Sequence, residues 1–132
     1  MRKLLCLVLV LLCVFSAAGC SKVSVSANAS AKVVYDYNGI SFSEVLTEQE
    51  TAAVAEILNG KRTVSYWGST PSCGFDSNIA IVIGGTRYAL ACDKCTTLKV
   101  CGTLATYIEI SQSERDVLEK IFTSRGGKFP CV

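Results

Sequence analysis

A polar motif that starts helices occurs twice in this chain and brackets its middle. Residues 47–50 (TEQE) and 111–114 (SQSE) each place a hydroxyl at a helix N-cap and a carboxylate three residues later. Each side chain can then hydrogen-bond the backbone amide of the other residue. Asn59-Gly60 and Gly126-Gly127 follow as stops. Both starts are followed by apolar residues at helical spacing: Val54, Ile57 and Leu58, then Val117, Leu118, Ile121 and Phe122. The sequence therefore predicts two amphipathic helices.

Between these helices the hydrophobic period changes from helical to two. Residues 79–83 (IAIVI) alternate, and Gly84-Gly85 provides a two-residue turn. Tyr88 and Leu90 then return on the same face, with Ile81 opposite Tyr88. This pattern predicts a β-hairpin.

Further strands are expected on either side of this hairpin. Leu98 and Val100 begin a second hairpin, whose loop at residues 101–103 would place Leu104, Ile108 and Ile110 on their face. Residues 62–67 add a strand, and the Asn38-Gly39 turn signals an early strand at residues 33–37 or 40–45. The predicted fold class is α+β: an antiparallel sheet of about five strands flanked by two amphipathic helices and stabilised by disulfides.

The N-terminus has the pattern of an export signal. Arg2 and Lys3 precede an uninterrupted apolar run at residues 4–15, and small residues then lead to Cys20. The run is shorter than the roughly 20 residues that a spanning helix needs. Here the chain resembles the lipobox of bacterial lipoproteins, although Ala17 stands where that family usually has Leu. The resemblance implies cleavage before Cys20, a diacylglyceryl group on its thiol, and a fatty acid such as palmitate on its amino group.

This resemblance predicts the domain organisation and the location of the protein. We expect a signal peptide at residues 1–19, a lipid anchor and flexible tether at 20–32, and one globular domain at 33–132. The partner of the acylated Cys20 would be the lipid bilayer of the cell membrane or outer membrane, with the domain on the extracytoplasmic side. Neutral Ser21 favours the outer membrane in bacteria that have one. A second interpretation stays open, because residues 16–18 also fit an ordinary signal peptidase that would release a soluble protein.

Composition excludes several functional classes. The chain has 13 Lys and Arg against 11 Asp and Glu, and removing Arg2 and Lys3 leaves 11 of each. No basic run is interleaved with aromatics, so nucleic-acid binding is not expected. The absence of histidine excludes Ser-His-Asp and Cys-His catalysis and His-ligated zinc. Asp76, Asp93 and Glu109 have no spacing that suits a carboxylate mechanism. We therefore predict a protein that is not an enzyme, with no catalytic residues, cofactor or metal.

Five cysteines remain after Cys6 and Cys13 in the signal and the acylated Cys20, namely Cys73, Cys92, Cys95, Cys101 and Cys131. Exported domains of this size often need disulfides, and five cysteines allow two bridges with one thiol left. If Cys20 were not acylated, six would pair evenly. The expected strand order separates Cys92 from Cys101 by roughly 13 Å at ~3.3 Å per residue, whereas bridged Cα atoms are at most about 7 Å apart.

The same strand order predicts the pairing. It favours Cys73 bonded to Cys92 or Cys95, and Cys101 bonded to Cys131 beside the end of the second helix. The leftover thiol would then be Cys92 or Cys95. Two other interpretations of the Cys92-Asp93-Lys94-Cys95 motif stay open. It could be a redox-active pair, although it precedes a strand rather than a helix. It could also contribute to a zinc site with two of Cys73, Cys101 and Cys131.

The remaining candidate site is the turn-rich loop at residues 66–72, where Tyr66 adjoins Trp67. Aromatic residues on loops often contact partners, but Trp67 could equally cap the core of the sheet. We hypothesise a non-enzymatic binding or inhibitory module that displays this loop to a protein or envelope partner. The alternative is a membrane-tethered thiol–disulfide protein that uses Cys92 and Cys95.

Overall fold

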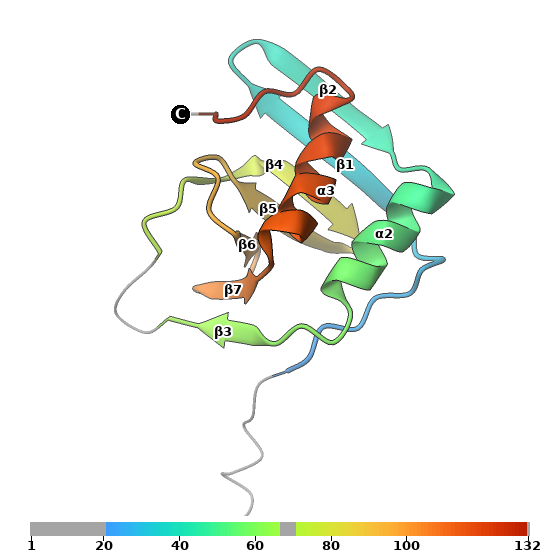
Figure 1. The fold of residues 1–132 in the computed structure, drawn as a ribbon, viewed down its shortest axis with the longest axis vertical. Helices are drawn as coiled ribbons and strands as arrows, with labels where there is room; N and C mark the ends of the chain where they lie inside the picture. Colours follow the sequence, from blue (N-terminus) through green and yellow to red (C-terminus); the bar gives the residue numbers. More distant parts are fainter. Residues whose placement is uncertain (1–20, 67–70, 132) are drawn as a thin grey trace, which may run out of the picture.

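Within residues 21–66 and 71–131, which the computed structural model describes, the chain forms a seven-stranded antiparallel sheet with two helices (Figure 1). The strands are β1 (Ala31–Tyr37), β2 (Ile40–Val45), β3 (Thr63–Ser65), β4 (Phe75–Ile83), β5 (Thr86–Ala91), β6 (Thr97–Val100) and β7 (Thr106–Glu109). The helices are α2 (Glu48–Leu58) and α3 (Gln112–Thr123). The prediction of an α+β fold is confirmed, whereas the expected number of about five strands is too low.

The order of strands across the sheet is β2-β1-β4-β5-β6-β7-β3. Two more strands form than expected because both segments beside the Asn38-Gly39 turn are strands. The turn itself has positive φ at both residues, 51° at Asn38 and 79° at Gly39, as a two-residue hairpin requires. β1 lies beside β4, and β3 pairs with β7 at the far edge of the sheet.

The hairpin of β4 and β5 has the predicted register, with Ile81 opposite Tyr88. The hairpin of β6 and β7 differs from expectation. Leu98 lies opposite Ile108, so the connecting loop spans residues 101–105 rather than 101–103. Leu104 therefore belongs to the loop and not to the core, and it is 86% exposed. The longer loop reverses the role of this residue, from a core side chain to a surface one.

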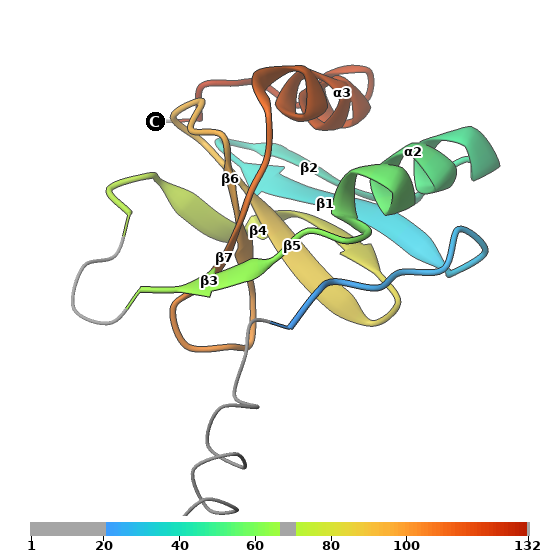
Figure 2. The ribbon, with the colours of Figure 1, turned by 60° about the horizontal axis from the view of Figure 1, so that its bottom comes forward.

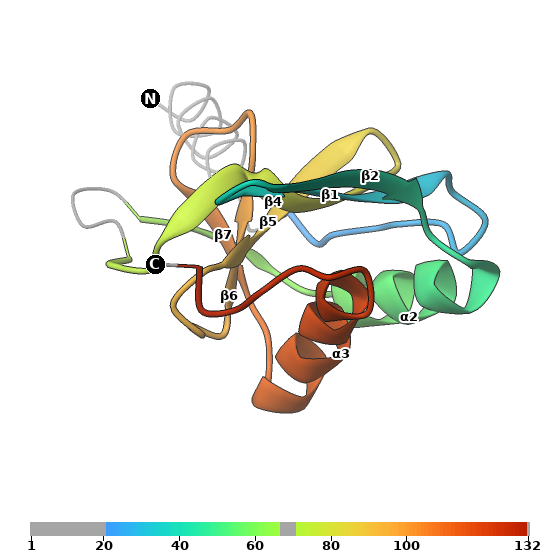
Figure 3. The same ribbon diagram turned by 90° about the horizontal axis from the view of Figure 1, so that it is seen from above.

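Both helices begin at the predicted capping boxes, with Thr47 and Ser111 as the N-caps. They cover the same face of the sheet, and the hydrophobic core lies between the two layers (Figure 3). Of the apolar residues expected to face this core, Val117 is instead 43% exposed. No helix of the described residues has the length and apolar content needed to cross a membrane.

The segment before β1 is not the free tether expected at residues 20–32. Val23 donates its amide to the Lys61 carbonyl and accepts from the Gly60 amide. The amide of Val25 donates to Asn59 Oδ1 at 2.6 Å, and Asn59 Nδ2 donates back to the Val25 carbonyl. The side chains of Val23 and Val25 pack against the core. Small polar composition suggested a spacer, but alternating valines and one asparagine hold this segment to the domain.

Candidate binding surface on the open face of the sheet

Two disulfides join one end of the sheet to its neighbouring segments. Cys73 is bonded to Cys95, one of the two partners that the strand order favoured, with their Cα atoms 6.0 Å apart. Cys92 is bonded to Cys131, with a Cα separation of 4.8 Å. The predicted Cys101–Cys131 bridge is therefore wrong. The cysteine left as a thiol among the described residues is Cys101, not Cys92 or Cys95.

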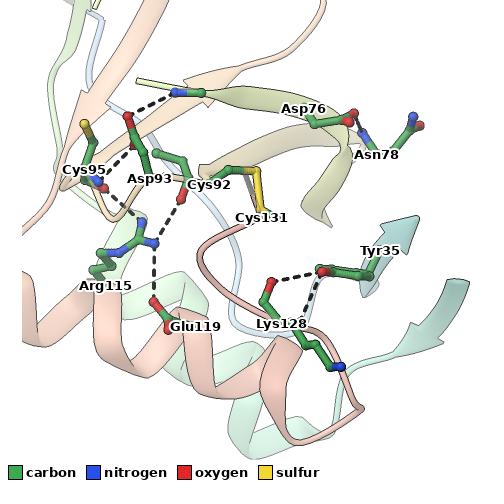
Figure 4. The surroundings of a disulfide bond; sticks show 12 residues. Tyr35, Asp76, Asn78, Cys92, Asp93, Cys95, Arg115, Glu119, Lys128 and Cys131 are labelled. Carbon is green, nitrogen blue, oxygen red and sulfur yellow. Dashed lines mark hydrogen bonds and ion pairs between the residues drawn. A yellow bond between two sulfur atoms is a disulfide. The ribbon is translucent and has the colours of Figure 1, made fainter. Parts of the chain in front are cut away.

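The Cys101–Cys131 bridge does not form because the tail after α3 runs in a different direction from the one expected. Gly126 has a φ of +92°, and a Cβ on Gly127 would lie 3.0 Å from the Phe122 carbonyl oxygen, so the chain reverses tightly over the end of α3. Lys128 is then held by Tyr35, whose hydroxyl donates to the Lys128 carbonyl and accepts from its amide. The tail consequently returns toward the Cys92 end of the sheet instead of continuing toward Cys101 (Figure 4).

Arg115 is a buried charged residue that the sequence reasoning did not identify. Its side chain is fully inaccessible and donates to the carbonyl oxygens of Cys95 and Ala91, both at 2.9 Å. It also pairs with Glu119 at 3.3 Å, and its guanidinium lies over the Phe129 ring (Figure 4). Burial lowers the pKa of Arg115, and the Glu119 carboxylate offsets only part of this effect. The residue ties α3 to the turn that contains the cysteine motif.

The bonding of the cysteine motif bears on both chemical alternatives. Cys92 and Cys95 are bonded to different partners, so they do not form a disulfide with each other. Asp93 lies beside Cys73 and Cys95 with its carboxylate and their sulfur atoms within 4.8 Å of one another. Both sulfurs are in a bridge, however, and bridged sulfur is not a thiolate ligand. Asp93 instead accepts from the amides of Gly74 and Cys95, which fixes the turn.

The face of the sheet away from the helices, here called the open face, carries the candidate site. Tyr107 alternates with the core residue Ile108 and therefore points to the open face. Its ring lies 5.5 Å from that of Tyr66 and 5.6 Å from that of Phe75. The three rings thus lie together on the open face, where the small residues Ala89 and Ala91 are also buried.

A hollow of about 390 Å³ adjoins these rings. It is lined by Phe75, Ser77, Lys99, Cys101, Gly102, Thr103 and Leu104. The thiol of Cys101 is half-buried, and its nearest hydrogen-bond acceptor is the Lys99 carbonyl at 3.9 Å. We call the set Tyr66, Phe75, Lys99, Cys101, Leu104 and Tyr107 the open-face patch. Its surface is apolar and aromatic with one cation, which is typical of a binding site.

Tyr66, the described aromatic residue of the predicted loop, is part of this patch. The Tyr66 amide donates to the Ala105 carbonyl, and the Tyr66 hydroxyl donates to Glu109 at 3.3 Å. Loss of solvation and the neighbouring Glu109 carboxylate raise the pKa of Tyr66. Trp67, the other residue of the prediction, lies outside the described residues. Sequence reasoning did not identify Leu104 as a surface residue, because a leucine beside strands whose hydrophobic residues alternate suggests a core position.

A second concavity of about 320 Å³ lies between α2 and α3 on the other side of the molecule. Glu50 lines this groove, and Arg125 binds it through two nitrogen–oxygen contacts of 2.8 Å. This hydrogen bonding by Arg125, aided by the Thr47 amide, lowers the pKa of Glu50 to about 2. Arg125 also contacts Glu44 of β2. The ion pairs join α2, β2 and the end of α3, so we assign them a structural role.

Comparison of the chain with protein-family models, with curated proteins and with solved structures found no match in any of the three.

Proposed function

We propose that this chain is a lipid-anchored extracytoplasmic protein that acts as a non-enzymatic binding module, with the open-face patch as its contact surface. The anchor rests on the resemblance of residues 16–20 to a lipobox. Two disulfides in a domain of this size fit the oxidising compartment to which such a signal leads. The observation that carries the binding role is the open hollow lined by Phe75 and the exposed Leu104, beside the aromatic ring of Tyr107.

The anchor can be tested by counting the free thiols of the mature protein as well as by measuring the mass of its acyl chains. If Cys20 is acylated, the denatured but unreduced mature protein has one thiol, that of Cys101. A secreted protein with Cys20 free has two thiols, and one with a Cys20–Cys101 bridge has none. Intact mass spectrometry after labelling with an alkylating reagent distinguishes these states and counts the acyl chains. A mature protein without acyl chains would overturn the anchor.

A matched variant completes this test. Cys20→Ser should abolish incorporation of labelled palmitate and move the protein out of the membrane fraction, whereas Cys101→Ser should leave both unchanged. Palmitate incorporation that persists in Cys20→Ser would contradict the assignment of the anchor to this residue.

The binding role can be tested in intact cells with a photo-activated amino acid. Placed at Ser77, which lines the hollow, it should form defined adducts, and Tyr66→Ala or Trp67→Ala should reduce them without lowering the melting temperature. The same amino acid at Val117, on the helical side, serves as the control. Equal adduct patterns from Ser77 and Val117 would contradict the assignment of the contact surface.

The thiol–disulfide alternative makes a different prediction. It requires Cys92 and Cys95 to exchange disulfides, so insulin-reduction activity should disappear in Cys95→Ser. The separate bridges of these two cysteines do not favour this function, because an exchanging pair normally alternates between a dithiol and its own disulfide.

A further inference from the structure

The start of the described chain is attached directly to β3 at the edge of the sheet. Ser21 accepts from the Thr63 amide and hydroxyl through its carbonyl, and their hydroxyls lie 3.1 Å apart. Cys20 directly precedes Ser21 in the sequence, and consecutive Cα atoms of any chain are about 3.8 Å apart. A lipid on Cys20 therefore has no spacer between it and the folded domain, and the surface around Thr63 must lie close to the bilayer.

Two cations lie at this attachment point. Lys22 and Arg62 form an isolated antiparallel bridge, and both are exposed. Paired residues of an antiparallel bridge point to the same face, and Arg62 alternates with Thr63, whose partner Ile108 points to the core. Both cations therefore lie on the open face. Like charges directly opposite one another are unfavourable, and neither has an ion pair within the described residues.

The most exposed large hydrophobic side chain of the described residues lies on the same side. Leu104 is 86% exposed in the loop of residues 101–105. From Thr63, where the chain is attached, β3 leads to Tyr66, whose amide binds the Ala105 carbonyl. Three residues of strand span roughly 10 Å. In Figure 2 the helices lie at the top, while this loop and the start of the described chain lie at the bottom.

We infer that the partner of the open-face patch is the bilayer itself: Leu104 enters the headgroup region while Lys22 and Arg62 bind lipid phosphates. This inference rests on the proposed anchor at Cys20. An exposed leucine on the same face as exposed lysine and arginine and a half-buried tyrosine is the composition of a membrane-interface contact. Anionic phosphates would also relieve the repulsion between Lys22 and Arg62. Lys99 adds a third cation, and Glu109, held by Tyr66, is a carboxylate of the same face.

The orientation that follows places the sheet toward the membrane and the helices away from it. The hollow beside Phe75 and Lys99 then lies at the level of the headgroups. The exposed Val117 of α3 lies on the outward side, which makes it a natural control for contact with lipid.

Tryptophan fluorescence of the full lipoprotein in vesicles tests this inference. In a Trp67→Phe background, Leu104→Trp should show a blue shift and a loss of emission in vesicles of phosphatidylglycerol and phosphatidylethanolamine with brominated acyl chains. Val117→Trp should show neither. Flotation of the vesicles in a density gradient reports the anchor separately. If the protein floats but the emission of the Leu104→Trp variant is not quenched, the bilayer contact is overturned while the anchor stands; if the protein does not float, the anchor itself fails.

Charge reversal provides a second test that leaves Leu104→Trp in place. Lys22→Glu combined with Arg62→Glu should restore the emission of the introduced tryptophan in the anionic vesicles. Lys120→Glu combined with Lys128→Glu, on exposed residues of α3 and its tail, should leave the quenching unchanged. Equal effects of the two charge reversals would overturn the role of Lys22 and Arg62. A photo-activated amino acid at position 104 that forms its adduct with a protein instead of lipid would also contradict the bilayer contact.

Discussion

The two faces of the sheet differ in whether their unusual residues have partners within the domain. On the helix-covered face, the buried Arg115 donates to two carbonyls, and the Cys92–Cys131 bridge holds the tail over the end of the sheet. On the open face, Cys101 retains a thiol and Leu104 is exposed. Each unusual residue of the first face completes the fold, whereas those of the second face leave a surface for a partner. Substitutions should therefore affect stability on one face and contact on the other.

The largest loss of stability is expected from Arg115→Met. The substitution removes charged donors from the carbonyls of Ala91 and Cys95 and leaves these groups buried without a strong partner. We expect the free energy of unfolding to fall by about 3–5 kcal/mol, measured by urea denaturation. Lys120→Met, on an exposed residue of the same helix, is the control. A loss below about 1 kcal/mol, the usual range of surface ion pairs, would mean that Arg115 is not an essential link between α3 and the cysteine motif.

Removal of the bridge at the same end should cost slightly less. Cys92→Ala combined with Cys131→Ala opens a loop with a sequence separation of 39, and we expect a loss of about 2–4 kcal/mol in unfolding free energy. Cys73→Ala combined with Cys95→Ala, with a separation of 22, should cost somewhat less, because loop entropy depends on length. Calorimetry of both double variants would test which one loses more unfolding free energy. Cys101→Ser should leave the melting temperature nearly unchanged, and a large decrease would contradict the unpaired state of this thiol.

The ion pair of Glu50 with Arg125 should give a moderate effect that depends on pH. The pKa of Glu50 is lowered from 4.5 to about 2 in the folded state. Its contribution is therefore complete above about pH 4.5 and is lost as the pH falls toward 2. We expect Glu50→Gln to lower the unfolding free energy at pH 7 by about 1–2 kcal/mol, after allowance for solvent screening.

Glutamine can still serve the capping box, so this variant isolates the ion pair. Acid titrations of the two proteins should converge near pH 2, as the carboxylate loses its charge. If the unfolding free energies of the two proteins keep a constant difference between pH 4.5 and 2, the titration of Glu50 is not the cause of that difference.

On the open face, the smallest effect on stability is expected from Leu104→Ser. Because the side chain is 86% exposed, its removal should change the unfolding free energy by no more than about 0.5 kcal/mol. The same variant should weaken the contact with vesicles in the experiments above. Thermal denaturation would test the first expectation, and a loss of several degrees would show that Leu104 supports the fold.

The structure corrected the sequence reasoning where distant segments meet. The spacing of Cys73 and the strand order were enough to narrow its partner to Cys92 or Cys95, and the structure shows the bond to Cys95. The Cys92–Cys131 bond depends on the reversal at Gly127 and on the contact of Lys128 with Tyr35, which lies 93 residues away. No local pattern indicates such a contact. The same holds for Arg115, which resembles an ordinary polar helix residue until its two carbonyl partners are known.

The sequence by itself determined the elements whose causes are local. The two capping boxes define where α2 and α3 begin, and the Asn38-Gly39 and Gly84-Gly85 turns define two hairpins, because each depends on bonds within a few residues. Only the tertiary structure decided which strand lies beside β4, which cysteine keeps its thiol, and that Leu104 points away from the core. These outcomes depend on the packing of segments far apart in the chain, and their free energies appear only when the sheet and helices come together.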